Sequence, residues 1–145
     1  MIENRVWEIL KRSPDRHNQF TPFQLCKEVI EKVPSWSEDI AVMFNMEFLY
    51  VVKEKINNLG RTWFLTPCKI KARVAIAMGV KEENVIIVKY SKNKIEFYSY
   101  KEGKETLDMP KFDVVVGNPP YMKNMHLKFL KMAYGCLKKD GKIVW

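Results

Sequence analysis

The sequence lacks long hydrophobic runs and has few cysteines or histidines. No apolar stretch among its 145 residues approaches the roughly 18 needed to span a membrane, and the N-terminal stretch has no signal-peptide core. The three cysteines, Cys26, Cys68 and Cys136, are widely separated and form no Cys-x-x-Cys pair, which argues against a metal site. We therefore expect reduced thiols in a cytoplasmic protein without membrane contact. The two histidines, His17 and His126, are interpreted as incidental.

What the sequence does have is the composition of one globular domain with an uneven positive charge. Hydrophobic residues make up 47% and charged residues 29%, and the length suits one domain better than two. The net charge is +8, and the stretch from Met122 to the end carries six lysines against one acid, Asp140. These lysines are Lys123, Lys128, Lys131, Lys138, Lys139 and Lys142. A solvated helix face and a polyanion partner both explain this excess, and charge alone favours the solvated face.

Helix-like and strand-like patterns alternate along most of the chain. Residues 2–12 have the spacing of an amphipathic helix, and Thr21-Pro22 with Gln24 predicts the capped start of a second helix. We then expect strands at 39–44, 62–65, 84–89 and 112–116 and another beginning at 142–145, helices at 47–57, 69–78 and 125–137, and a hairpin between 84–89 and 94–100. This alternation predicts an α/β fold with a doubly wound, mainly parallel sheet. Residues 1–36 would form an N-terminal helical cap and residues 37–145 the α/β domain.

Residues 112–122, FDVVVGNPPYM, place two consecutive prolines directly after a predicted strand. Strands commonly end in glycine, asparagine and proline for conformational reasons, so a tight loop is one interpretation. A ligand site is the other, because ligands of doubly wound sheets bind beyond the carboxyl ends of strands where the strand order reverses. We expect the strands at 39–44 and 112–116 to be neighbours at that point.

The segment from Asn118 to Tyr121 offers fixed hydrogen-bond acceptors beside an aromatic ring. The side-chain oxygen of Asn118 and the carbonyl of Pro119 both accept, while Pro119 and Pro120 fix the backbone. Two rigid acceptors suit an amino group with two N–H bonds, and Tyr121 supplies a surface on which a planar base stacks. Holding both hydrogens favours a pyramidal nitrogen whose lone pair points at an electrophile. Such chemistry needs no strong general base.

GNPPY after a hydrophobic strand resembles the catalytic motif of amino-group methyltransferases that use S-adenosylmethionine. That family includes N6-adenine DNA methyltransferases of restriction–modification systems, RNA base methyltransferases and enzymes that methylate a glutamine of release factors. Phe20-Thr21-Pro22 is similar to the segment that reaches over the cofactor in the DNA adenine subgroup. The resemblance implies a Rossmann-like methyltransferase fold and a DNA base flipped out of the duplex. It implies as catalytic residues Asn118, Pro119, Pro120 and Tyr121, and as cofactor contacts Thr21, Val42, Asn45 and Glu47.

The sequence departs from this family at three cofactor positions. Residues 40–48 stand where the family has an acid and a glycine-rich turn, and side chains at Phe44 and Met46 would crowd a bound nucleoside. After the second strand, residues 64–68 contain no acid, and after the third the chain reads Val88-Lys89-Tyr90. We therefore expect weak or lost binding of S-adenosylmethionine by this chain alone.

The family's fold usually continues through two further strands and a target-recognition region. We therefore expect a sheet that is incomplete at its C-terminal side, with a missing C-terminal region or a partner protein completing it. The leading hypothesis is a fragment or minimal chain of a site-specific adenine-N6 DNA methyltransferase, inactive by itself. The alternative is a non-catalytic methyltransferase-like module that binds DNA or regulates an enzyme. Methylation of RNA or of a protein glutamine is a third hypothesis.

Overall fold

The computed structural model describes residues 23–34, 37–56, 58–91, 94–106, 109–117 and 125–144. Three predicted features lie outside these residues: the helix over 2–12, the cap at Thr21, and the segment from Asn118 to Tyr121.

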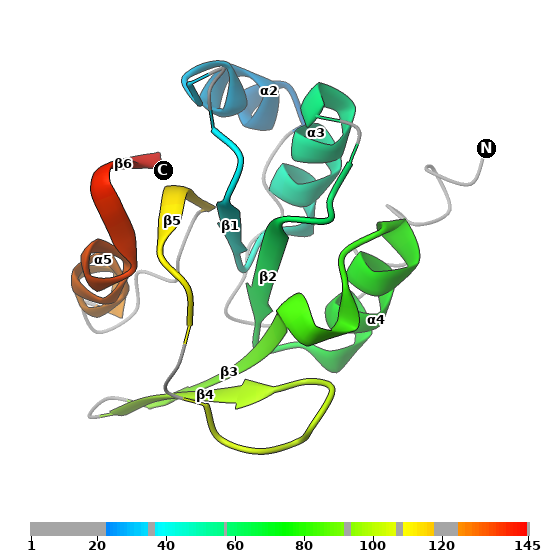
Figure 1. Cartoon of the computed structure of the whole chain (residues 1–145), viewed down its shortest axis with the longest axis vertical. Helices are drawn as coiled ribbons and strands as arrows, with labels where there is room; N and C mark the ends of the chain where they lie inside the picture. The colour runs from blue at the N-terminus through cyan, green and yellow to red at the C-terminus, as the bar shows by residue number, and fades with distance from the viewer. Residues whose placement is uncertain are drawn as a thin grey trace.

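The described strands form one sheet of six in the order β4-β3-β2-β1-β5-β6 (Figure 1). The strands are β1 (Ile40–Met43), β2 (Thr62–Thr66), β3 (Val85–Ser91), β4 (Lys94–Ser99), β5 (Phe112–Gly117) and β6 (Leu137–Val144). All neighbouring strands are parallel except β3 and β4, which form an antiparallel hairpin. The predicted doubly wound, mainly parallel sheet is confirmed.

Helices cover both faces of the sheet, which explains why the central strands β1, β2 and β5 and the first half of β3 are largely apolar and buried, unlike the edge strands β4 and β6. The helices are α2 (Phe23–Glu31), α3 (Met46–Ile56), α4 (Lys69–Met78) and α5 (Met125–Gly135), with a short 3₁₀ turn, η1, over Glu82–Asn84. The first three lie on one side of the sheet and α5 on the other (Figure 1). Side chains alternate accordingly. Ile40 and Val42 enter the cluster beneath α2, α3 and α4, here called the α3-face cluster. Ala41 and Met43 enter the α5-face cluster.

The last strand begins earlier than predicted. The sequence indicated a helix to residue 137 and a strand from 142, with Asp140-Gly141 as the turn between them. Instead α5 ends at Gly135, and the Phe112 N–H donates to the Cys136 carbonyl at 2.7 Å, so the chain pairs with β5 as soon as it leaves the helix. A register shift follows, since Phe112 pairs with Leu137 but Val114 pairs with Lys142. Asp140-Gly141 is therefore an irregularity within β6.

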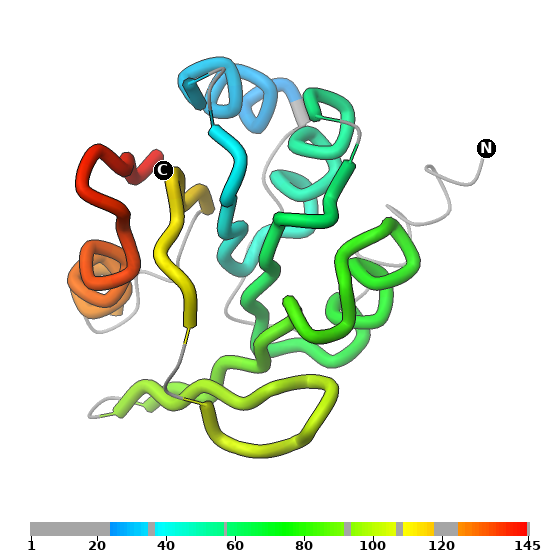
Figure 2. The backbone as a smooth tube through the Cα atoms, viewed as in Figure 1, coloured from blue at the N-terminus to red at the C-terminus, as the bar shows by residue number. Residues whose placement is uncertain are grey.

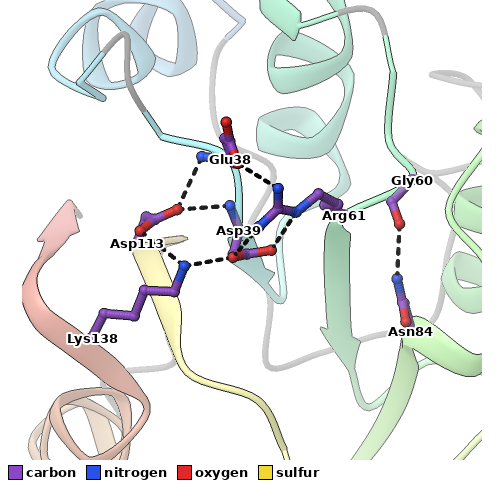
Figure 3. A network of polar contacts seen from close by, with 7 residues as sticks. All are labelled: Glu38, Asp39, Gly60, Arg61, Asn84, Asp113 and Lys138. Atoms are coloured by element: carbon purple, nitrogen blue, oxygen red, sulfur yellow. Dashed lines mark hydrogen bonds and ion pairs between the residues drawn. The ribbon is translucent and has the colours of Figure 1, made fainter.

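Charged side chains tie four strands together at the amino-terminal edge of the sheet (Figure 3). Asp39 accepts from Arg61 Nε at 2.8 Å and from Lys138 Nζ at 2.6 Å. Asp113 accepts from the backbone N–H groups of Glu38 and Asp39 at 3.0 and 2.9 Å. Arg61 also pairs with Glu38, and Lys138 with Asp113 at 3.3 Å. We call these five residues the amino-edge network. They fix the register of β1, β2, β5 and β6 from one end.

The amino-edge network predicts a loss of stability in acid. Hydrogen bonds from Arg61 lower the pKa of Asp39. For Asp113, burial raises the pKa, but backbone N–H groups and Lys138 outweigh it, so that this pKa is also lowered. A carboxyl whose pKa is lower in the folded state stabilises the fold above its unfolded pKa of about 3.9 and loses that contribution as the pH falls through the folded value. The free energy of unfolding should therefore be steady near neutral pH and fall below about pH 4.

Urea unfolding between pH 3 and pH 7, for the native chain and Asp39→Asn, measures this contribution. At pH 7 we expect the substitution to cost about 0.5–1.5 kcal/mol, since hydrogen bonds to the Asp39 carboxylate are weakened while its cationic partners are largely exposed to solvent. The difference between the two proteins should shrink toward pH 3. A difference that is independent of pH would show that the Asp39 carboxylate charge does not stabilise the fold.

Candidate functional site

The order of the strands reverses between β1 and β5. From β1 the chain builds outward to β2 and β3, then returns to place β5 on the other side of β1. Met43, the last residue of β1, lies opposite Leu65 of β2 and Gly117 of β5. The predicted adjacency of the strands at 39–44 and 112–116 is confirmed. In folds of this kind the carboxyl ends of two such strands border the ligand crevice.

Gly117 is the point of closest approach between the two central strands. A Cβ at this position would lie 2.4 Å from the Met43 carbonyl oxygen and 3.1 Å from the Met43 Cβ. The glycine is therefore required by space and not by a positive φ. Asn118 follows it directly in the chain, so the last described residue before the predicted catalytic segment lies at the strand-order reversal. The roles of Asn118, Pro119, Pro120 and Tyr121 stay predictions.

Only Phe44 and Asn45 connect β1 to α3, and the chain passes almost directly from strand to helix (Figure 2). Phe44 has a positive φ of 73°, and the Asn45 N–H donates to the Met43 carbonyl at 2.9 Å. This bond closes a γ-turn of the rare, strained form around Phe44. The Phe44 N–H donates to the Leu65 carbonyl at 2.7 Å, which extends the pairing of β1 with β2.

The Phe44 ring packs into an aromatic trio on the α5 face of the sheet. Its centroid lies 4.8 Å from that of Phe129 on α5 and 6.1 Å from that of Tyr90 near the end of β3. Tyr90 and Phe129 are 5.3 Å apart, and all three contacts are edge-to-face, the arrangement that aromatic pairs prefer. Phe44 is 0% exposed. The sequence indicated that Phe44 would crowd the crevice, but it carried no signal for the partners Tyr90 and Phe129.

The other predicted cofactor contacts are spread over different surroundings. Val42 is fully buried in the α3-face cluster, and Thr21 lies outside the described residues. Asn45 is buried, and its carbonyl accepts from the Phe48 and Leu49 N–H groups in the first turn of α3. Glu47 is 3% exposed and lies near Cys26 of α2: burial and then the Glu47 charge raise the pKa of the Cys26 thiol to about 12. Their roles toward a cofactor stay predictions.

The ends of β2 and β3 carry no acidic side chain toward the same edge. β2 ends at Thr66, whose hydroxyl accepts from the Cys68 N–H at 3.1 Å. β3 carries Lys89 and Tyr90 near its end, and the Lys89 ammonium sits 4.6 Å from the centre of the Tyr98 ring on β4. A ribose-binding carboxylate is therefore absent from both described strand ends.

Two other kinds of site are absent from the part of the chain that the structure describes. It contains no group of three or more histidine, cysteine, aspartate or glutamate side chains able to hold a metal ion. Nor does it contain a helix that is long and apolar enough to cross a membrane.

Three of the C-terminal lysines that the structure describes, Lys128, Lys131 and Lys138, lie in two different surroundings. Lys138 is bound in the amino-edge network through Asp39 and Asp113, at the end of the sheet away from the crevice. Lys128 and Lys131 are exposed on α5, the helix that follows the predicted catalytic segment. The number of charges along the sequence does not distinguish the ion-paired Lys138 from the exposed lysines of α5.

A family model described as Eco57I restriction-modification methylase matches residues 44–143, from the residue after β1 to Ile143, the residue before the last of β6. No curated protein matches the chain.

Proposed function

The chain belongs to the Eco57I restriction-modification methylase family, whose match covers more than half of it, and on this premise we propose that it carries the catalytic motif of a methyltransferase that modifies the N6 amino group of adenine in DNA. Membership alone indicates a DNA methyltransferase in general. The observation that supports the finer proposal is the position of Gly117, which brings the start of the GNPPY segment to the carboxyl end of β5 beside β1.

The proposed chemistry uses the acceptors of this segment. The Asn118 side-chain oxygen and the Pro119 carbonyl accept the two hydrogens of the adenine amino group, and Tyr121 stacks on the base. The base is flipped out of the duplex, because its amino group is otherwise held in a base pair. With both N–H bonds held, the nitrogen lone pair is directed at the methyl donor. The histidines are not required for this step.

In this family the methyl donor is S-adenosylmethionine, and the described residues of the β1–α3 connection do not fit it. The Phe44 ring fills the carboxyl end of β1, and the N–H groups of Phe44 and Asn45 are bonded within the protein. This observation favours a second candidate function, a methyltransferase-like module that binds DNA or regulates an enzyme without binding the cofactor.

Labelled methyl transfer separates the two candidates. The full-length protein is incubated with methyl-tritiated S-adenosylmethionine and with duplex DNA that contains or lacks adenine, and the DNA is hydrolysed to nucleosides. We expect label only in N6-methyldeoxyadenosine. Label in cytosine contradicts the adenine proposal, as does transfer to RNA or to a release-factor glutamine when these substrates are supplied in parallel reactions. DNA binding without any methyl transfer, at cofactor concentrations that saturate the protein, supports the second candidate.

Binding to DNA should depend on the lysines of α5 and not on Lys138. Because neutralised phosphates release counterions, reversing Lys128 and Lys131 to glutamate should lower the slope of log K against log salt by about 0.9 for each phosphate that is no longer neutralised, similarly for all sequences. The matched control reverses Lys101 and Lys104, which are exposed beyond β4 and change the net charge equally. Equal weakening by both pairs, measured by fluorescence anisotropy, would mean that only the net charge matters.

A further inference from the structure

The β1–α3 connection contains a strained residue. Among the described residues, Phe44 is the non-glycine residue with a positive φ, a conformation that is rare for a bulky side chain. Such a residue persists only where its surroundings hold it in place, and strained positions cluster at ligand sites and switches. Here the surroundings are Phe129, Tyr90 and the hydrogen bond from the Phe44 N–H to Leu65.

The γ-turn determines on which face of the sheet the Phe44 ring lies. In a regular strand, Phe44 would follow the alternation of β1 and place its ring with Val42 in the α3-face cluster. The γ-turn instead places it in the α5-face cluster, which also contains Met43. The ring thereby bridges the end of β1, the end of β3 and helix α5.

The backbone N–H groups of the same turn are also already hydrogen-bonded within the protein. A cofactor-binding turn after the first strand of a doubly wound sheet uses glycine so that the ligand can approach the backbone, and its free N–H groups point at the ligand. In this chain the Phe44 and Asn45 N–H groups donate to Leu65 and Met43, at 2.7 and 2.9 Å. In this conformation the turn therefore offers a cofactor neither room beside its backbone nor free N–H groups at Phe44 and Asn45.

We infer that the Phe44 γ-turn is a closed form of the cofactor crevice, in which the Phe44 ring acts as a plug held by Phe129 and Tyr90. S-adenosylmethionine binds to a minor open form, in which the ring has left these partners. The identity of the ligand rests on the proposed function. If the open form makes up about 0.1–10% of the molecules, the apparent Kd is raised about 10- to 1000-fold over that of an open site.

Equilibrium dialysis with labelled S-adenosylmethionine tests the plug without an activity assay. Phe44→Gly removes the ring and suits the positive φ, so we expect it to bind at least about tenfold more tightly than the native chain. Phe48→Leu is the matched control, because Phe48 is a buried ring of the α3-face cluster. It should bind like the native chain. Circular dichroism and thermal melting establish that each variant is folded.

Phe129→Leu is a second test, which leaves the turn unchanged and shortens the partner of the ring. It should also tighten binding, and it decides the question if Phe44→Gly does not fold. Low-micromolar binding by the native chain, or no gain with the folded variants, overturns the inference. Methyl transfer is then measured on whichever protein binds the cofactor. Tighter binding without transfer to adenine would contradict the proposed function while leaving the plug intact.

Discussion

Asn118→Ala should lower the rate of methyl transfer to adenine about 100- to 1000-fold, equivalent to about 2.7–4 kcal/mol, as for the loss of one hydrogen bond to a group that develops charge in the transition state. The reason is that the Asn118 oxygen is proposed as one of only two acceptors that hold the amino group. Thermal melting should be unchanged. The rate is measured as methyl incorporation into an adenine-containing duplex, with the variant that binds the cofactor most tightly as the parent.

Companion variants separate the proposed roles within the segment. Asn118→Asp should be milder than alanine, because a carboxylate still accepts hydrogen bonds. Tyr121→Ala should cost about 1–3 kcal/mol through weaker base stacking, whereas Tyr121→Phe should have little effect, since the ring and not the hydroxyl is used. Full activity of Asn118→Ala, or a loss that follows unfolding alone, would leave the tetrapeptide as an ordinary end of a strand.

Gly117→Ala should both destabilise the fold and disable the site. The new Cβ would lie 2.4 Å from the Met43 carbonyl oxygen, so β5 must move away from β1. Forced shifts of this kind typically cost about 1–3 kcal/mol. The shift also displaces Asn118, and a misplacement of about 1 Å in a catalytic group can cost about 100-fold in rate. Chemical denaturation and methyl incorporation measure the two effects separately.

Gly135→Ala provides the control for this substitution. Gly135 ends α5, and a Cβ there meets nothing within 4 Å. The same chemical change should therefore be neutral or stabilise the chain by up to about 1 kcal/mol, because it reduces the freedom of the unfolded state. If Gly117→Ala were equally harmless, the close approach of β1 and β5 would not constrain the catalytic segment.

The sequence predicted the features that depend on local patterning. Helix α4 begins at Lys69 and ends before Gly79 as expected, because apolar spacing and a glycine stop are local signals. β6 was predicted to start too late, because its first residues are drawn into the sheet by Phe112, a partner that no local pattern reveals. Similarly, Lys138 pairs with Asp39, which lies 99 residues away, so counting charges could not find it.

The candidate site was predictable in place but not in detail. The adjacency of β1 and β5 was predicted and is confirmed. The crowding of a cofactor by Phe44 and Met46 stays a prediction, and Met46 is buried in the α3-face cluster. The γ-turn was not predicted, because positive φ angles are normally signalled by glycine or asparagine and here the residue is Phe44. Its aromatic partners Tyr90 and Phe129 come from two other elements, which only the tertiary fold brings together.

The amino-edge network makes the two ends of the sheet unequal in how freely they can change during evolution. Its ion pairs and hydrogen bonds hold four strands in register from one side. The connections at the carboxyl ends of the strands are therefore not needed to hold the register. They can shorten, lengthen or exchange residues while the strands stay aligned. The two-residue connection after β1, in place of a glycine-rich loop, is a divergence that the amino-edge network permits.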